Sequence, residues 1–167
     1  MLKGGSAVKS LIEQTLLDNY EKYYRIAYSY MKNEHDALDV VQESAYKAMK
    51  QWKKVKQEQY IETWIYKIVV NTALNVLKKQ QKHSSYEESL ITEPSYEENF
   101  EQHDDLISLL ATLEEKDRTV IILRFFEDLK IEQIASIIGE NSNTTKSRLY
   151  RAIRKLRLNA DITSCSL

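Results

Sequence analysis

The sequence is poor in the residues that interrupt or cross-link a chain. Its 167 residues include three glycines, one proline and one cysteine. Because Cys165 stands alone, neither a disulfide nor a cysteine-based zinc site can form within the chain, and a reducing compartment fits. With few glycines and prolines, and with Leu, Lys, Glu, Gln and Ala frequent, the chain is expected to be all-α.

Long apolar runs are missing as well. Residues 1–14 contain no continuous apolar stretch of the kind that a signal peptide needs. Runs such as residues 120–123 are too short to span a bilayer. These absences predict a cytoplasmic protein. The formal net charge of −1 averages over acidic and basic segments that are well separated, so the local balance carries the functional information.

Helical spacing of apolar residues predicts a first small domain over residues 10–82. One amphipathic helix is expected over residues 16–31, a second around residues 36–48 and a third from residue 61 onward. The second and third helices should bury Leu38, Val41, Ala45 and Ala48, and Ile61, Ile65, Ile68, Val69, Thr72 and Val76, respectively.

Residues 83–104 differ in character and are expected to form a flexible acidic linker. They contain the only proline, Pro94, and no sustained apolar stripe. Helical periodicity then resumes, which predicts a second small domain over residues 105–160. The acids that crowd this stretch and its edge are Glu87, Glu88, Glu93, Glu97, Glu98, Glu101, Asp104 and Asp105.

Residues 131–156 have the spacing of a helix-turn-helix. Gly139 suits the left-handed conformation that ends a helix, and residues 141–143 offer turn and N-cap side chains. The apolar faces would be Ile131, Ile134, Ala135 and Ile138 in the first helix, and Leu149, Ala152, Ile153 and Leu156 in the second.

The second helix of this motif is basic and outward-facing in this interpretation. No acid lies between residues 142 and 157, which suits a groove lined with phosphates. The first turns of such a helix meet base edges, and Arg148 is the best candidate to read a guanine. The alternative is a solvated basic face on an ordinary core helix. The predicted DNA contacts are Asn143, Thr144, Lys146, Ser147, Arg148, Arg151, Arg154 and Lys155.

Three segments, in order, resemble the extracytoplasmic-function (ECF) group of the sigma-70 superfamily, the subunits that select promoters for bacterial RNA polymerase. DALDVVQESAYKA (residues 36–48) resembles region 2.1 to 2.2, and ETWIYKIVVNTALNVLKK (62–79) resembles regions 2.3 and 2.4. LRFFEDLKIEQIASIIGENSNTTKSRLYRAIRKLR (123–157) resembles region 4. The match is nearly full length and is nearest to the sigma-V type. It implies two all-α domains, sigma region 2 and sigma region 4.

The resemblance implies a binding surface for the minus-10 promoter element on the third helix. A polar and basic stripe lies opposite its apolar face, and in the family this helix holds a base taken out of the stack. Asn71 would pair with the base edge while lysines neutralise phosphates. A merely solvated helix surface is the alternative. The residues assigned are Lys67, Asn71, Asn75, Lys78 and Lys79.

The second helix carries an acidic ridge opposite its apolar face. In the family this ridge docks on the clamp helices of the polymerase beta-prime subunit, and region 4 contacts the beta flap. The resemblance further implies a membrane-anchored anti-sigma partner and an envelope-stress response. Taken alone, the ridge would more often be a solvated helix face. The residues assigned to polymerase binding are Asp36, Asp39, Gln42 and Glu43.

One position departs from the family pattern. Thr145 stands where the family usually has a valine in the core of the helix-turn-helix. A buried hydroxyl must find a partner or cost stability, so Thr145 is expected to bond a nearby backbone carbonyl. The departure puts the pose of the second helix in question.

Other residue classes predict no catalytic or ligand site. Trp52 and Trp64 are expected to pack, and the three histidines lack ligand spacing, so neither a metal nor a cofactor is expected. An enzyme with paired carboxylates near Glu87 or Asp104 is disfavoured because these acids lie in the expected linker; no small-molecule substrate is expected. The remaining alternative to a sigma factor is a stand-alone dimeric helix-turn-helix regulator, which would need a self-complementary face.

Overall fold

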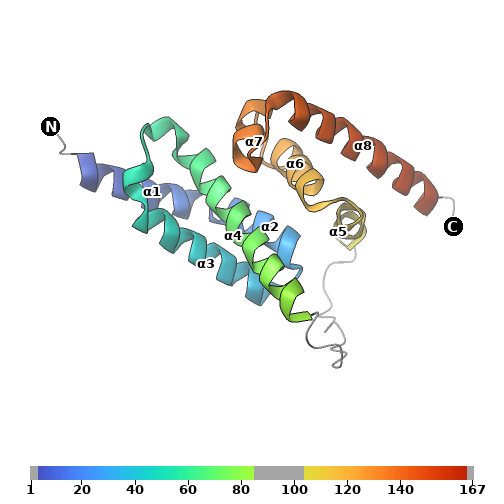
Figure 1. Ribbon diagram of the computed structural model, residues 1–167, viewed down its shortest axis with the longest axis horizontal. Helices are drawn as coiled ribbons and strands as arrows, with labels where there is room; N and C mark the ends of the chain where they lie inside the picture. The colour runs from blue at the N-terminus through green and yellow to red at the C-terminus, as the bar shows by residue number, and fades with distance from the viewer. Residues whose placement is uncertain (1–3, 85–103, 165–167) are drawn as a thin grey trace.

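The chain folds into two groups of helices that lie against each other (Figure 1). The structure is a computed structural model that describes residues 4–84 and 104–164. Over these ranges it contains helices and turns and no strand, which confirms the all-α prediction. Most of the predicted linker, residues 85–103, lies outside the described residues. No helix in the described ranges is long and apolar enough to cross a membrane.

The first group comprises α1 to α4 and differs from the prediction at its start. The helix expected over residues 16–31 is interrupted at Asn19, whose side-chain amide donates to the Thr15 carbonyl at 3.0 Å. Asparagine favours such helix ends because its side chain competes for backbone hydrogen bonds. The elements are α1 (Gly4–Asp18), α2 (Tyr20–Met31), α3 (Glu34–Lys50), η1 (Trp52–Lys54), η2 (Glu58–Tyr60) and α4 (Ile61–Ser84).

Helix α4 buries more than the one stripe that its sequence suggests. Ile61, Ile65, Val69 and Thr72 are buried as predicted, but so are Tyr66, Val70 and Ala73. The additional burial arises because α4 contacts α2 and α3 of its own group and also α7 of the second group. The Tyr66 ring meets Tyr23 of α2 edge to face, with centroids 5.0 Å apart. Helix α4 is therefore held from both groups.

The second group contains the predicted helix-turn-helix. Gly139 adopts the left-handed conformation (φ 71°) and its N–H bonds the Ala135 carbonyl, which ends α7. The Asn141 side-chain oxygen accepts the Thr144 N–H at 2.8 Å and caps α8. Both observations confirm the turn chemistry expected from the sequence. The elements are α5 (Asp104–Ala111), α6 (Glu115–Phe125), α7 (Ile131–Ile138) and α8 (Ser142–Ser164).

Thr145 occupies the core of this motif. The residue is fully buried, and its hydroxyl donates to the Asn141 carbonyl at 2.9 Å. The prediction that the hydroxyl bonds a backbone carbonyl is confirmed. The same carbonyl accepts the Thr145 N–H at 3.0 Å, as in any helix. The threonine is thus accommodated by a local bond that leaves the helical backbone intact.

Two arginines and one buried carboxylate join the helix groups. The Glu127 side chain follows α6 and is 0% exposed; it accepts a hydrogen bond from Arg25 of α2 at 2.6 Å. The Tyr66 hydroxyl of α4 donates to its second oxygen at 3.2 Å. Nearby, the guanidinium of Arg118 in α6 donates to the Ser29 carbonyl of α2 at 2.7 Å. The two groups therefore form one packed body in this structure.

Substitutions at Thr145 test the account of the helix-turn-helix core. We expect Thr145→Val to leave the free energy of unfolding unchanged or raise it by up to about 1 kcal/mol, because the Asn141 carbonyl keeps its backbone partner. Thr145→Ser keeps the hydroxyl but loses a buried methyl, and should cost about 1 kcal/mol. Urea denaturation followed by circular dichroism measures both. A loss of more than about 2 kcal/mol in the valine variant would contradict the argument.

Candidate nucleic-acid interface

The first turns of α8 present small polar side chains to solvent. Asn143, Thr144, Lys146 and Ser147 are exposed, and buried Thr145 beneath them anchors the turn. Further along the helix Arg151, Arg154 and Lys155 are exposed as well. Seven of the eight residues that the sequence assigned to this surface are therefore accessible to a ligand. Tyr150, which has no role in the sequence-based prediction, is also 66% exposed on this helix.

Arg148 is the exception, because its guanidinium is held by two carboxylates. The Nε and Nη2 atoms donate to the two Glu140 oxygens at 2.7 and 3.0 Å, and Nη1 donates to Asp117 Oδ1 at 2.8 Å. The side chain is only 19% exposed. The expectation that Arg148 points outward was wrong. The first turn of α6 and the turn after α7 supply carboxylates that α8 itself lacks.

Asp117 also binds a second arginine of α8. Arg151 donates to Oδ1 through Nη2 at 3.0 Å and to Oδ2 through Nε at 3.3 Å. The Asp117 side chain is 5% exposed, whereas that of Arg151 is 59% exposed. Sequence reasoning missed Asp117 because it lies 31 and 34 residues from its partners, beyond any periodic pattern.

These contacts shift the ionisation of both carboxyl groups. Burial alone would raise the pKa of Asp117, but hydrogen bonds from Arg151 and Arg148 outweigh it, so the pKa lies below its ordinary value. The hydrogen bond from Arg148 lowers the pKa of Glu140, and Lys116, whose ammonium lies 3.0 Å away, lowers it further. Bonding to Glu140 and Asp117 raises the pKa of Arg148. Asp117, Glu140 and Arg148 are therefore charged at neutral pH.

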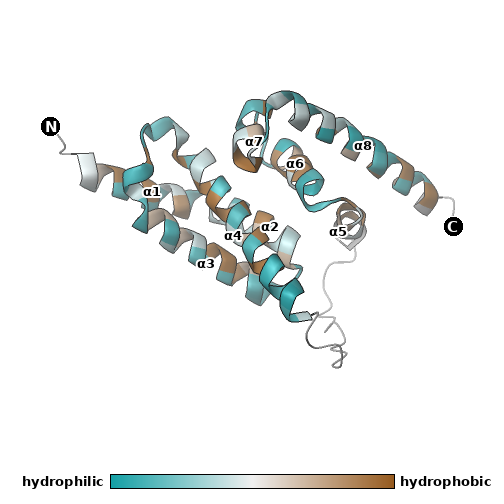
Figure 2. Cartoon of the chain, viewed as in Figure 1, coloured by the Kyte–Doolittle hydropathy of each residue, from teal (hydrophilic) through white to brown (hydrophobic). Residues whose placement is uncertain are grey.

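The polar stripe predicted on α4 is solvent-accessible along its whole length. It remains so although α7 packs on the same helix. Residues three and four apart share a helical face, so Asn71 lies between cationic neighbours on one surface. The C-terminal end of α4 is the hydrophilic part of this helix in Figure 2. The exposed residues are Lys67, Asn71, Asn75, Lys78 and Lys79.

Some residues of the acidic ridge on α3 make contacts within the protein. Asp39, Gln42 and Glu43 are exposed, and Glu43 pairs with Lys47 at 2.7 Å. Asp36 is half-buried; its carboxylate accepts hydrogen bonds from the amides of Asn33 at 2.9 Å and of Gln80 in α4 at 3.0 Å. Asp36 therefore ties the start of α3 to α4, and three of the four predicted residues remain available to a partner.

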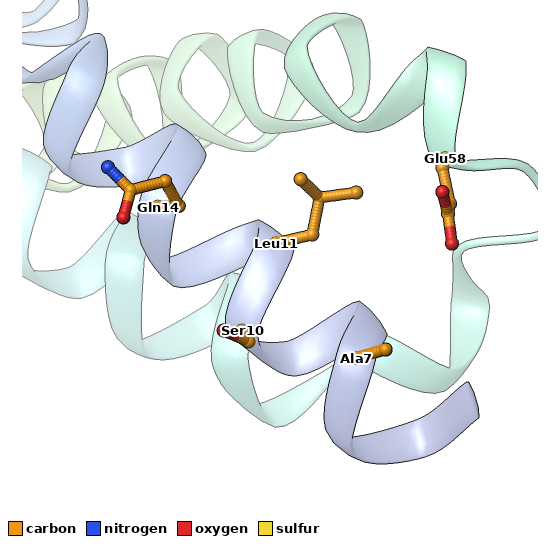
Figure 3. A pocket seen from close by; sticks show the side chains of 5 residues that line it. All are labelled: Ala7, Ser10, Leu11, Gln14 and Glu58. Atoms are coloured by element: carbon orange, nitrogen blue, oxygen red, sulfur yellow. The ribbon is translucent and has the colours of Figure 1, made fainter. Parts of the chain in front are cut away.

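The surface of the first group has three further features. Ligand atoms of His35, Asp36 and Asp39 lie within 4.8 Å of one another, a proximity that was not predicted from the sequence. A hollow between α1 and the η2 turn offers no cationic side chain to a phosphate (Figure 3); its lining is Ala7, Ser10, Leu11, Gln14 and Glu58. Trp52 packs with its ring against Gly5 of α1, in accord with its predicted packing role.

Comparisons with known proteins agree with both halves of this geometry. The family model described as Sigma-70 region 2 matches residues 16–83, and Sigma-70, region 4 matches residues 103–156. RNA polymerase sigma factor SigV of Bacillus subtilis is 43% identical over 94% of this chain and 95% of its own. ECF RNA polymerase sigma factor SigW of the same species is 25% identical over 85% of each chain.

Solved structures share the fold at lower identity. The sigma factor RpoE of Bartonella quintana, in complex with the anti-sigma factor NepR, superposes with a TM-score of 0.75 at 23% identity over 90% of this chain and 96% of its own. CnrH, in complex with the cytosolic domain of CnrY, gives a TM-score of 0.69 at 18% identity over 93% of this chain and 98% of its own.

The structure is that of an all-helical transcription factor with two exposed polar faces, one on α4 and one on the helix-turn-helix. More particularly, the chain belongs to the sigma-70 family of RNA polymerase sigma factors, in its ECF group. Members of this family are transcription initiation factors and are not enzymes in themselves. The resemblance seen in the sequence is thereby confirmed.

The lowered pKa values at Asp117 and Glu140 predict a specific loss of stability in acid. Below about pH 4 the unfolded chain takes up protons on these groups that the folded chain does not, so the free energy of unfolding falls. Glu140→Gln removes one such group, so its free energy of unfolding should fall less steeply with decreasing pH than that of the wild type. Urea denaturation between neutral and acid pH gives the slopes.

The matched control is Glu132→Gln, which changes an exposed acid on α7. If Glu140→Gln and Glu132→Gln change the pH dependence of the free energy of unfolding equally, the contact between Glu140 and Arg148 is not the cause of the loss of stability in acid.

Proposed function

We propose that this chain acts as an alternative sigma factor that binds core RNA polymerase, recognises the minus-35 and minus-10 promoter elements and directs transcription initiation. One observation carries the proposal: a capped helix-turn-helix with an exposed basic helix and a second exposed basic stripe on α4 occur in one sigma-70 chain. Catalysis belongs to the polymerase.

The minus-35 element is assigned to α8. Asn143, Thr144, Lys146 and Ser147 lie on its exposed first turns, where a helix in the major groove meets base edges. The exposed cations Arg154 and Lys155 follow about two turns later and suit phosphates, whereas Arg151 is exposed but bonded to Asp117. Arg148 is left out of base reading because Glu140 and Asp117 hold its guanidinium.

The minus-10 element is assigned to α4. An asparagine amide offers both a donor and an acceptor to the edge of an unstacked base, and Asn71 is exposed at the middle of the stripe. Lys67, Lys78 and Lys79 flank it and would neutralise the backbone of the displaced strand. Strand opening would then be favoured because the protein binds the open form.

Core polymerase is assigned to the acidic ridge and to the second helix group. Asp39, Gln42 and Glu43 project from a rigid helix and would dock on the beta-prime clamp helices by charge complementarity. Asp36 would support the ridge through its bond to α4 rather than contact the partner fully. The second helix group, which contains sigma region 4, would contact the beta flap, as the family resemblance implies.

Regulation by an anti-sigma factor is part of the proposal. The two solved neighbours are the sigma factor RpoE in complex with the anti-sigma factor NepR, and CnrH in complex with the cytosolic domain of CnrY. We infer a comparable membrane-anchored partner for this chain, a cytoplasmic location and an envelope-stress response. Support comes from the shared fold and from membership of the ECF group.

Simultaneous binding of both promoter elements requires the helix groups to separate. Elements at positions −35 and −10 lie about 85 Å apart on straight duplex DNA at about 3.4 Å per base pair. In this structure α4 contacts α7, and α7 leads through one turn into α8. Packed helices lie about 8–10 Å apart, so the two DNA-binding helices are far closer than the elements they would bind.

Reconstituted transcription tests the function. The purified chain and core polymerase, given a library of promoter fragments, should yield sequence-specific run-off transcripts. Asn71→Ala should reduce open-complex formation about tenfold, the value of one lost base contact, while Gln81→Ala on the same helix serves as control. Absence of transcripts, together with palindromic binding by the chain alone, would establish the stand-alone dimeric regulator instead.

Removal of the Glu127 carboxylate tests the separation of the groups. Glu127→Ala leaves the Tyr66 hydroxyl without its partner and should shift the free chain toward an open form with a larger radius of gyration in small-angle X-ray scattering. Its exposed neighbour provides the control, Asp128→Asn. An unchanged radius in Glu127→Ala would show that Glu127 does not hold the groups together.

A further inference from the structure

We propose that Asp117 and Glu140 are specificity-determining positioning residues of the DNA-reading helix: they clamp Arg148 and Arg151 and withhold these guanidinium groups from DNA phosphates. The inference rests on the proposed minus-35 function of α8. It concerns how strongly that helix distinguishes its own site from any other DNA sequence.

The clamp is formed by carboxylates from outside the helix that they control. Asp117 lies in the first turn of α6, where its charge also faces the positive end of the helix dipole. Arg148 and Arg151 are three residues apart on one face of α8 and converge on it. A single oxygen, Oδ1, accepts from both arginines, at 2.8 and 3.0 Å. Because this carboxylate is 5% exposed, losing either partner would leave a poorly solvated charge.

Glu140 closes the clamp from the turn between α7 and α8. Its two oxygens accept a bidentate pair of hydrogen bonds from Arg148, the strongest geometry available to a guanidinium and a carboxylate. Lys116 of α6 reaches the same carboxylate at 3.0 Å. Three cations are thus balanced by two carboxylates where the sequence of α8 alone suggests an unbroken basic surface.

The clamp divides the cations of α8 into two classes. Lys146, Arg154 and Lys155 are exposed and make no ion pair within the described ranges 4–84 and 104–164. These side chains can neutralise phosphates at little cost. Arg148, in contrast, would have to leave two carboxylates, and Arg151 would have to leave one.

Keeping Arg148 and Arg151 away from phosphates raises the ratio of specific to non-specific affinity, and not the affinity for DNA in general. Phosphate neutralisation is independent of sequence and stabilises every complex equally, whereas base contacts stabilise only the correct one. The clamp also joins α6, the turn and α8, and so fixes the angle at which the first turns of α8 meet base edges. Both effects favour the correct site relative to all others.

The test compares binding of a selected and a scrambled duplex. Full-length protein assembled with core polymerase first enriches a short duplex from a random library, and core polymerase alone is measured for subtraction. Fluorescence anisotropy over a range of salt concentrations then gives both affinities and the slope of log K against log salt. The variants are Asp117→Asn, its conservative rescue Asp117→Glu, Glu140→Gln, and the charge-matched control Asp128→Asn. The Asp128 carboxylate is exposed and pairs with Arg124 of α6.

Asp117→Asn should bind the scrambled duplex about three- to tenfold more tightly at low salt and steepen the salt slope by about one, because Arg151 becomes free to neutralise a phosphate. The ratio of selected to scrambled affinity should fall about tenfold. Asp117→Glu should restore most of the ratio, and Asp128→Asn should leave the slope and the ratio as in the wild type.

Three results would overturn the inference. One is an equal effect of Asp117→Asn and Asp128→Asn, which would indicate net charge alone. Another is weaker binding to both duplexes with an unchanged salt slope, which a purely structural role would give. The third applies if Asp117→Asn does not fold. In that case, a salt slope and a ratio of selected to scrambled affinity in Glu140→Gln that equal those of the wild type would overturn the inference. Failure of the wild type to enrich any duplex would instead overturn the proposed function itself.

Discussion

A buried carboxylate is stable only where cations or donors from elsewhere in the chain satisfy it, and this constraint organises the whole molecule. Glu127 joins the two helix groups because its partners, Arg25 and Tyr66, lie in α2 and α4. Asp117 joins α6 to α8 through Arg148 and Arg151. Apolar packing brings the helices together, and each of these carboxylates bonds side chains from other helices.

The same constraint distinguishes the contacts that can persist in the proposed complex with DNA from those that would be lost. The clamp around Arg148 lies within one helix group, so it can persist on DNA. The Glu127 contact lies between groups, so it is lost if they separate along a promoter. Arg25 is half exposed and regains water on separation, whereas the Tyr66 hydroxyl and Glu127 exchange a buried bond for solvent.

Features governed by near neighbours could be predicted from the sequence. Gly139 ends α7, Asn141 caps α8 and the Thr145 hydroxyl bonds a carbonyl four residues earlier, all as expected, because each depends on atoms within one turn. The exposed stripe around Asn71 followed from helical periodicity alone. The expected helix over residues 16–31 failed at Asn19, where periodicity continues across a local break.

The helical class, the helix-turn-helix and the basic and acidic faces follow from residue type and spacing along the chain, so they can be predicted without the structure. Which of these charges remain available to a partner depends on how the helices pack. Asp117 meets Arg148 across 31 residues and Asp36 meets Gln80 across 44, and no periodic pattern encodes such meetings. Charge on a helical face can be read from the sequence, but its neutralisation depends on which helices pack together.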